Sequence, residues 1–508
     1  MSNNKQIAKN ITYSSISFIL NFCVSFFLSP YLIRTLGKEA YGFFPLINNI
    51  IEYTSIVTAV VGSMAGRFIT MSYYQDKIEE AKGYFNSAIV AYMVMSLFFC
   101  VLGIVFVIFI NNFLNVPGYL LSDVRWVFGI ALIGFCLSLC TNLFGIGTYV
   151  KNRLDWTSKA SMISKCIYVA FVLILFYYFK PTIVFISIAS FISTLYVIYT
   201  NFNFKRKLIP EIRFQPKKYF SWKKLRTLTS SGIWMSFNQL SNILVTTVDL
   251  LLANIFINAA TTGDFAVSKT VPSLITSIVF ILSSSFFAQF NILYAKHQYD
   301  ELVHETRKSI IILSVLVSIP LGFFLISSDY FFQVWIKSAY DPIMFWLSFI
   351  SLIGTISGLA TTPLFGIFTA TDKRKVPAIA LMIVGLLNII IAYIALKETS
   401  LGVLAIPLTS TVLLGIRNIF FTPIYGAMCL GLKKWVFYPP IIKSWIAIAI
   451  TIIFTLLARH LMYEISWSAF FLNFFIVAAL SLGTNYYIIL TKSERNFLVQ
   501  AIKNKIKI

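Results

Sequence analysis

Charged side chains inside long apolar runs are the residues with the clearest chemical potential in this sequence. They are Glu52, Arg67, Lys165, Asp249, Lys269 and Arg417. Charges inside a membrane are costly, so they usually face the interior of a helix bundle or a water-filled cavity. Cations outnumber acids among these residues. A cavity lined by them would therefore favour an anionic group such as a phosphate, to which arginine can donate forked hydrogen bonds.

Asp249 is the charge that is hardest to explain as a surface residue. It lies well inside the apolar run 229–257, and its short side chain cannot reach the membrane interface as a lysine can. We interpret it as a cavity residue that acts as a cation or proton site, or as the partner of a basic residue. A structural hydrogen bond between helices is the alternative interpretation.

Asp249 also belongs to a polar stripe. Asn238, Asn242, Thr246 and Asp249 are spaced by four, four and three residues, which predicts one face of one helix. Ser14, Ser17, Asn21 and Ser25 form a comparable stripe near the N-terminus. Such stripes either line a cavity, with Asn242 as a lining residue, or hold helices together through hydrogen bonds.

The other charges have structural interpretations as well. Glu52 and Arg67 could pair with each other to hold helices together. Lys269 lies near the start of its apolar run and could extend to the interface, as could Arg67 at a predicted cytoplasmic end. Lys165 and Arg417 are assigned to a cavity only from their position inside apolar runs and their sign.

The composition is that of an all-α polytopic membrane protein. Of the 508 residues, 58% are hydrophobic and 12% are charged, against roughly 25% charged residues in a typical soluble domain. The net charge of +22 is explained by basic residues kept in cytoplasmic loops, so we expect no nucleic-acid partner. The six cysteines lie in or beside apolar runs and are interpreted as small core residues.

Fourteen apolar runs are long enough to cross a membrane, which takes about 20 residues. They are 11–34, 43–68, 86–111, 124–149, 159–179, 182–202, 229–257, 264–291, 309–328, 342–369, 377–396, 400–425, 435–458 and 466–490. The division at Lys180-Pro181 is the least marked. With fourteen helices, most Lys and Arg residues fall in loops on one side, which predicts that both termini are cytoplasmic.

The two halves of the chain share a constant offset of 221 residues. Asn242 then falls on Asn21, and Gly263 falls on Gly42 in a predicted tight turn. An even number of helices in each half predicts two parallel six-helix bundles. The predicted domains are a bundle at 1–204, a basic cytoplasmic linker at 205–228, a second bundle at 229–432, and two extra helices with a tail at 433–508.

Signatures of enzymes are missing from the sequence. It contains no GxxxxGK[ST], GxSxG, HExxH or CxxC motif, and His297, His304 and His460 lack metal-ligand spacing. We expect a protein that is not an enzyme, with no catalytic residues, no metal site and no cofactor.

The linker itself combines basic and aromatic residues. Tyr219, Phe220, Trp222 and Leu225 alternate with Lys217, Lys218, Lys223, Lys224 and Arg226. This pattern suits a short helix on the anionic inner leaflet. An ordinary linker that is basic because it is cytoplasmic is the alternative.

The amino-acid sequences of two segments resemble those of a known superfamily. They are KNITYSSISFILNFCVSFFLSPYLIRTLGKEAYGFF (9–44) and NQLSNILVTTVDLLLANIFINAATTGDFAV (238–267). Together with the fourteen helices, two parallel bundles, basic linker and two appended helices, the chain resembles the multidrug/oligosaccharidyl-lipid/polysaccharide exporter superfamily. Within it, the local sequence is similar to that of the polysaccharide-transporter branch, which contains bacterial O-antigen and capsule-unit flippases.

The resemblance implies a multi-pass flippase in the bacterial cytoplasmic (inner) membrane. Its cargo would be an undecaprenyl-diphosphate-linked oligosaccharide, moved from the inner to the outer leaflet by alternating access for O-antigen (lipopolysaccharide) or capsule biosynthesis. Coupling to H⁺ or Na⁺ is proposed for several such proteins. The implied partners are membrane lipids and the polymerase and chain-length proteins of the same pathway.

Two residues match positions of the family. Asp249 matches an acid in helix 7 and is the candidate for cation coupling, and Arg67 resembles a basic position in helix 2. The chain departs from the drug-exporter relatives because Leu28 lies where Asp249 falls in the repeat, so the first helix lacks an acid.

Other functions remain open from the sequence. A drug/cation antiporter of the same superfamily would need a more acidic cavity, whereas a flippase for a peptidoglycan lipid precursor would also favour cations. A membrane glycosyltransferase or ligase would normally carry a large outer loop, and the predicted loops are short. A scaffold without transport activity would leave the buried charges unexplained.

Overall fold

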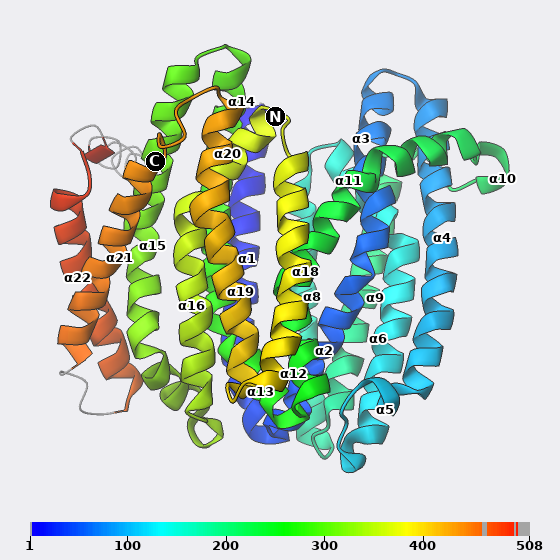
Figure 1. Ribbon diagram of the computed structural model, residues 1–508. Helices are drawn as coiled ribbons and strands as arrows, with labels where there is room; N and C mark the ends of the chain where they lie inside the picture. Colours follow the sequence, from blue (N-terminus) through cyan, green and yellow to red (C-terminus); the bar gives the residue numbers. More distant parts are fainter. Residues whose placement is uncertain (1–2, 460–464, 492–493, 496–508) are drawn as a thin grey trace. The chain divides into compact units, whose positions relative to one another are not determined.

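The computed structural model describes residues 3–459, 465–491 and 494–495, and the chain in these ranges forms helices without any strand (Figure 1). His460 and nearly all of the C-terminal tail lie outside the described residues. The fold class predicted from composition is confirmed.

The helices fall into a first and a second series along the chain. The first series is α1 (Asn3–Leu36), α2 (Lys38–Tyr53), α3 (Ser55–Tyr74), α4 (Ile78–Ile108), α5 (Ile110–Phe113), α6 (Leu121–Thr141), α7 (Ile146–Val150), α8 (Leu154–Tyr178), α9 (Ile183–Leu208) and α10 (Pro216–Tyr219). The second series is α11 (Trp222–Thr246), α12 (Val248–Phe256), α13 (Ala259–Ser268), α14 (Thr270–Ala295), α15 (Tyr299–Ile336), α16 (Ile343–Thr361), α17 (Leu364–Ala370), α18 (Lys375–Glu398), α19 (Ala405–Ile416), α20 (Thr422–Cys429), α21 (Tyr438–Arg459) and α22 (Trp467–Ile488). Residues 417–421 between α19 and α20 form one π-helical turn.

The number of membrane spans agrees with the sequence prediction. Thirteen helices in the described part of the chain are long and apolar enough to cross a membrane, and a bent pair, Ser236–Thr246 with Val248–Phe256, makes up to fourteen. The least marked division is correct as well, since α8 ends at Tyr178 and α9 begins at Ile183.

Several predicted spans are broken helices rather than single rods. The run 43–68 is interrupted at Thr54, whose hydroxyl donates to the carbonyl of Ile51 at 2.6 Å and so competes with the helical ladder. The run 229–257 breaks at Thr247 with a bend of 44°. Four consecutive β-branched residues, 245–248, surround this break, and such residues lose side-chain freedom in a helix.

The helices group into two compact units, each described by itself. One unit contains the chain up to Ile243 together with Ala253–Gly263. In it, α4 packs between α3 and α6, and α8 packs between α1 and α9. Tyr92 and Phe85 of α4 are almost fully buried in this core.

The other unit contains Leu244–Leu252 and the chain from Asp264 onward. Helix α15 is its centre and packs against α14, α16, α21 and α22 (Figure 1). Buried serines allow the helices to approach closely, as where the hydroxyl of Ser314 lies 2.6 Å from that of Ser444. The two appended helices, α21 and α22, are thus integral parts of this unit.

The glycine pair predicted to form matching turns lies within helices instead. Gly42 is in α2 and Gly263 is in α13. A Cβ atom on Gly42 would lie 2.7 Å from the Cα of Gly263, and a Cβ atom on Gly263 would lie 2.1 Å from the carbonyl oxygen of Lys38. The turn prediction was wrong because the glycines are required for close helix contact. The contact joins positions that are equivalent in the repeat.

Substitution of Gly263 by alanine tests this contact. We expect Gly263→Ala to lower the free energy of unfolding by about 1–3 kcal/mol, because the backbone of Lys38 cannot move away without strain. Gly129→Ala in α6 is the matched control, since nothing lies within 4 Å of the added methyl group. Thermal unfolding of the purified variants measures both. Equal midpoints for the two variants would show that the contact is dispensable.

Candidate functional site

The structure brings together two of the predicted residues, Asp249 and Lys269. The Nζ atom of Lys269 lies 2.9 Å from Oδ2 of Asp249 and also donates to the carbonyl oxygen of Thr246 at 2.7 Å. The side chain of Asp249 is 6% exposed and that of Lys269 is 22% exposed. The ring of Phe265 lies 5.3 Å from the ammonium group. Asp249 is therefore the partner of a basic residue.

Breaks in two helices place this ion pair. Thr246 ends α11 and Asp249 lies in the first turn of α12, while Lys269 occupies the break between α13 and α14. The C-terminal end of a helix carries partial negative charge and the N-terminal end carries partial positive charge. The ammonium group therefore lies at the negative end of α11, and the carboxylate lies at the positive end of α12.

This position differs from the sequence interpretation of Lys269. The sequence also allowed Lys269 to extend to the membrane interface from the start of its span. The span extends from Ala259 to Tyr294, so α13 precedes the lysine. Its ammonium group is held by Asp249 and Thr246 inside the unit.

Polar side chains from two further helices complete the surroundings of Asp249. Asn388 of α18 is fully buried beside the carboxylate, although its Nδ2 atom makes no hydrogen bond of ordinary geometry within the described residues. The hydroxyl of Thr409, in α19, donates to Oδ1 of Asn388 at 3.1 Å. Oδ1 of Asp249 has no hydrogen-bond partner among the described residues. The carboxylate thus has one oxygen that makes no hydrogen bond of ordinary geometry, with the Asn388 amide beside it.

Arg417 forms a second buried centre in the same unit. It is 8% exposed and begins the π-helical turn. Its Nη1 donates to Asn418 at 3.3 Å and its guanidinium carbon lies 5.5 Å from the centre of the Phe365 ring. Asn418 in turn donates to Ser357 at 3.2 Å. No acid pairs with Arg417 in the part of the chain that the structure describes, and its Nε atom has no hydrogen-bond acceptor there.

A proline explains why the helix widens after Arg417. Pro423 has no N–H group, so the carbonyl of Ile419 loses its usual helical donor. The hydroxyl of Tyr438 supplies a replacement at 2.9 Å, and the hydroxyl of Thr422 donates to the carbonyl of Arg417 at 3.2 Å. Single π-turns of this kind occur frequently at functional sites. Arg417 is therefore held in an irregular segment whose backbone is nevertheless satisfied.

The remaining predicted charges lie in the other unit and are separate from one another. Lys165 is near the middle of α8 and half-buried, with its ammonium group 5.0 Å from the centre of the Tyr168 ring. Glu52 near the end of α2 and Arg67 in α3 are both exposed on the surface of the unit. The structure shows no ion pair between them, so the alternative that they hold helices together as a pair has no support here. The helix break at Thr54 lies between them.

The predicted polar stripe does not continue as one face. Asn238, Asn242 and Thr246 are exposed, whereas Asp249 is buried. The bend at Thr247 separates Asp249 from the other three, because a regular helical spacing no longer holds across the break. Sequence spacing alone could not show this.

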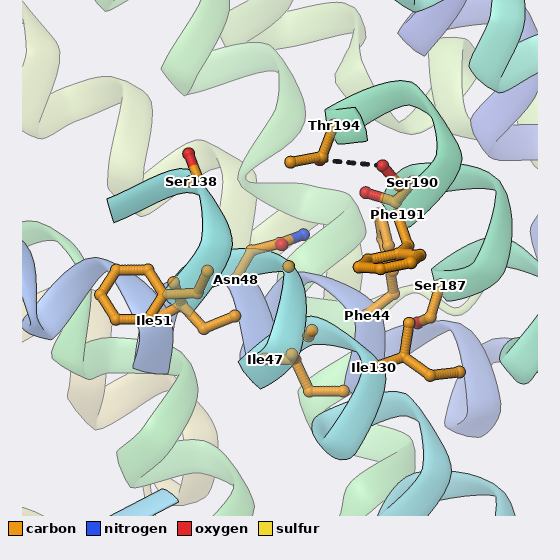
Figure 2. Close-up of a pocket in the computed structure, with 13 residues that line it drawn as sticks. Phe44, Ile47, Asn48, Ile51, Ile130, Ser138, Ser187, Ser190, Phe191 and Thr194 are labelled. Carbon is orange, nitrogen blue, oxygen red and sulfur yellow. Dashed lines mark hydrogen bonds between the residues drawn. The ribbon is translucent and has the colours of Figure 1, made fainter. Parts of the chain in front are cut away.

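A small cavity lies elsewhere, between α2, α6 and α9 (Figure 2). Its volume is about 230 Å³, and it is bordered by Asn48, Ser187 and Ser190 together with the rings of Phe44 and Phe191. The hydroxyl of Thr194 donates to the carbonyl of Ser190 at 2.9 Å. The cavity carries no charge and contains none of the predicted site residues.

The sequence analysis missed Asn388, Thr409 and Asn418. Each is a neutral polar residue inside an apolar run, and such residues are common in membrane helices. The buried acid Asp155 was also missed. It accepts from Arg153 at 3.0 Å and from Gln6 at 2.9 Å, and it joins the start of α8 to α1. Its place at a helix end, next to basic loop residues, gave it the pattern of a surface residue.

Up to fourteen spans, several of them broken helices, and buried charges define a multi-pass membrane protein. No group of His, Cys, Asp and Glu residues that could hold a metal ion occurs among the described residues. Two solved structures share the fold. A MATE multidrug transporter in an inward-facing conformation aligns with a TM-score of 0.65 at 13% identity, over 83% of this chain and 98% of its own. The lipid II flippase MurJ aligns with a TM-score of 0.62 at 15% identity, over 94% and 98%.

The sequence comparisons identify the family. The family described as "Polysaccharide biosynthesis protein" matches residues 7–288, more than half of the chain, and the protein belongs to this family. The "Uncharacterized membrane protein EpsK" of Bacillus subtilis (strain 168) is 30% identical over 433 residues, which are 85% of each chain. The resemblance to the polysaccharide-transporter branch is thereby confirmed.

The Asp249–Lys269 ion pair can be tested through stability. We expect Lys269→Gln to lower the free energy of unfolding by about 3 kcal/mol or more, because it leaves a buried carboxylate without its cation. Asp249→Asn should cost less, since Lys269 keeps the carbonyl of Thr246 and is partly exposed. The double variant should be more stable than Lys269→Gln. Thermal unfolding midpoints of the detergent-solubilised proteins measure these differences.

Arg374→Gln is the control for that series. Arg374 forms an exposed ion pair with Asp372, with exposed fractions of 60% and 88%, so its loss should change stability by less than about 0.5 kcal/mol. Strictly additive effects of the two substitutions at Asp249 and Lys269 would contradict a coupled pair.

Proposed function

We propose that this protein moves an anionic, lipid-linked oligosaccharide between the leaflets of the bacterial cytoplasmic membrane. The cargo would be an undecaprenyl-diphosphate-linked repeat unit, carried outward by alternating access for a surface polysaccharide such as O-antigen or capsule. Membership of the polysaccharide biosynthesis family supports the pathway. The chemical observation that supports the proposal is the buried Arg417, which pairs with no acid among the described residues.

Arg417 supports an anionic cargo for an energetic reason. A guanidinium group that is removed from water needs hydrogen-bond acceptors or a counter-charge to offset its lost hydration. Asn418 and the Phe365 ring supply part of this, but neither carries a negative charge. A diphosphate offers several acceptor oxygens in the geometry that a guanidinium group binds in a forked manner. We assign Arg417 to contact with the cargo during transport.

The cargo itself requires only limited help from the protein. Its lipid part already lies in hydrocarbon, so only the diphosphate and the sugars must be shielded on the way across. A cationic, polar environment would lower that barrier. The remaining predicted cavity residues, Arg67, Lys165, Glu52 and Asn242, belong to the proposal as secondary contacts, and Lys165 is the one among them that lies in mid-helix with partial burial.

Asp249 and Lys269 are proposed as the coupling element. Oδ1 of Asp249 is an available acceptor, and the carbonyl of Thr246 is shared with Lys269. A proton on the carboxylate would remove the charge that holds Lys269, and a sodium ion would compete with the ammonium group for the same oxygens. Either event would free the lysine to meet an anionic group. The coupling ion would then be H⁺ or Na⁺.

The proposed orientation has both termini in the cytoplasm. It rests on the excess of Lys and Arg in the loops on that side. The polymerase and the chain-length proteins of the same polysaccharide pathway are the proposed protein partners.

Two other functions fit the same fold. The MATE neighbour is a multidrug transporter and the MurJ neighbour is a lipid II flippase, so the fold does not choose between them. A drug/cation antiporter needs an acid that can accept an organic cation, whereas Asp249 is already neutralised by Lys269. That pairing favours an anionic cargo. A peptidoglycan lipid precursor carries the same chemistry as an oligosaccharide carrier and must be distinguished by experiment.

Deletion of the gene in its host tests the proposed cargo. We expect loss of one surface polysaccharide, together with accumulation of its intact lipid-linked unit in the cell, because the unit can no longer cross the membrane. Glycan profiling and extraction of lipid-linked sugars from the same culture measure both. An unchanged glycan profile with greater sensitivity to cationic drugs would indicate an antiporter. Accumulation of the peptidoglycan precursor would indicate the other flippase.

Variants that complement the deletion strain test the roles of Arg417 and Asp249. Arg417→Gln should lower surface glycan about tenfold or more, since a charge-assisted hydrogen bond contributes about 1.5–3 kcal/mol. Arg417→Lys should restore part of the activity. Asp249→Asn should impair transport at normal protein levels. Arg374→Gln is the exposed control and should transport normally. Wild-type glycan from Arg417→Gln would remove this residue from the mechanism.

A further inference from the structure

The basic linker is fixed to the end of α4 rather than free. We call residues 205–226 the linker platform. The side chain of Asn86 in α4 donates to the carbonyl of Arg213 at 3.0 Å and accepts from the N–H of Gln215 at 2.7 Å. The hydroxyl of Ser87 makes the same kind of double contact with the backbone of Ser221, at 2.9 and 3.2 Å. Asn86 and Ser87 are fully buried. These bonds hold the platform at a fixed position.

Buried side chains anchor the platform from below. Ile209 and Ile212 are fully buried against the core that contains α3 and α4. The stem of Lys224 lies against Gly83, and its Nζ donates to the carbonyl of Glu80 at 3.1 Å. Burial lowers the pKa of the Lys224 ammonium group. Lys224 is therefore a structural lysine, unlike its neighbours on the platform.

The platform lies at the level where hydrocarbon ends. Helix α4 contains no charge from Gly83 to Ile108. The part that begins at the platform contact, Ser87–Ile108, measures about 31 Å at about 1.5 Å per residue, close to the roughly 30 Å of a bilayer core. Helix α9 gives the same level independently. Its uncharged part from Ile183 covers a similar length before Lys205 begins the basic residues. Figure 1 shows α10 and the first turns of α11 crossing α4 instead of following it.

The outward side of the platform is cationic and aromatic. The exposed basic residues are Arg206, Lys207, Arg213, Lys217, Lys218, Lys223 and Arg226. The exposed aromatic residues are Phe214, Phe220 and Trp222, and Trp222 is 72% exposed. None of these basic residues forms an ion pair within the described part of the chain. Two acids lie nearby. Glu211 accepts a hydrogen bond from the Tyr73 hydroxyl at 3.1 Å, and Glu79 pairs with Lys82 of α4 at 2.7 Å.

We propose that the linker platform binds the anionic phosphate headgroups of the membrane leaflet at this end of the protein. Aromatic side chains such as Trp and Tyr are enriched at the level of lipid headgroups. Unpaired lysines and arginines at the same level attract anionic lipids. The platform collects these lipids beside α4 and α11. This inference is independent of the cargo and goes beyond the proposed function.

A soluble polyanion fits the platform less well. Trp222 and Phe220 lie beside the cations, at the level of the hydrocarbon boundary, where their rings reach lipid chains. Nucleic acid and acidic proteins would leave those rings in water.

Fluorescence of Trp222 in vesicles tests the proposal. The full-length protein is reconstituted in phosphatidylcholine containing a minor fraction of phosphatidylglycerol, and either lipid is supplied in brominated form at equal mole fraction. The chain has nine tryptophans, so the Trp222 signal is the difference between the protein and Trp222→Phe. We expect brominated phosphatidylglycerol to quench as if its local share were roughly fivefold above its bulk share. Raising NaCl to about 0.5 M should reduce that enrichment.

Two matched triple variants assign the effect to the platform. Lys217→Gln/Lys218→Gln/Lys223→Gln should abolish most of the enrichment. Lys180→Gln/Lys337→Gln/Lys397→Gln removes the same charge from exposed sites outside the platform and should leave the enrichment unchanged. All six lysines are exposed, so both proteins should fold. Equal quenching by the two brominated lipids, or equal loss in both triple variants, would overturn the proposal.

Discussion

A bilayer core offers no water to a backbone group, so every interrupted helix must find a partner inside the protein. This constraint explains the polar contacts of the second unit. The break after Thr246 exposes a carbonyl that receives the ammonium group of Lys269. Pro423 removes a donor from Ile419, and the Tyr438 hydroxyl replaces it. In both places the irregular backbone and a buried charge occur together. The charges are therefore tied to breaks in the helices, where a small change in geometry alters their partners.

The two buried centres differ in what they lack. Asp249 has its counter-charge in Lys269, and one of its two carboxylate oxygens has no hydrogen-bond donor among the described residues. Arg417 has neutral neighbours and pairs with no acid among the described residues. Its positive charge is therefore unbalanced there, and its Nε–H group has no acceptor. In the proposed function, the first centre would respond to a proton or a cation, and the second would respond to an anion. A transporter that exchanges an inward cation for an outward anionic cargo needs both properties, and it needs them in separate places so that they do not cancel.

The sequence predicted the spans because apolar length is read directly from residue order, and it predicted the family from the sequences of two segments. Of the six charges inside apolar runs, Asp249 and Arg417 are buried, whereas Glu52 and Arg67 are exposed. The sequence could not predict the breaks. Thr54 and Thr247 interrupt helices through local hydroxyl bonding and β-branched crowding, which a hydropathy pattern averages out. The breaks then decide the rest. They bury Asp249 while Asn242 stays exposed, and they bring Lys269 to the end of α11, where it pairs with Asp249. Glycine was misjudged for a related reason: Gly42 and Gly263 have the sequence context of turns, and only the packing shows that a helix backbone passes where a Cβ atom would lie.

Neutralisation of Asp249 has a consequence for how selectivity could evolve in this fold. An acid that pairs with a lysine of the same protein can bind an organic cation only if the cation displaces that lysine. Because the lysine is tethered, its local concentration is very high, and cationic substrates bind weakly. The same lysine favours anions. When the carboxylate loses its charge, the lysine is already in place, so binding an anion costs little side-chain entropy. Loss of one side chain, Lys269, would reverse that preference by leaving a bare acid among oxygen donors. In the proposed function, Lys269 beside a helix break would thus set the sign of the charge that this protein accepts.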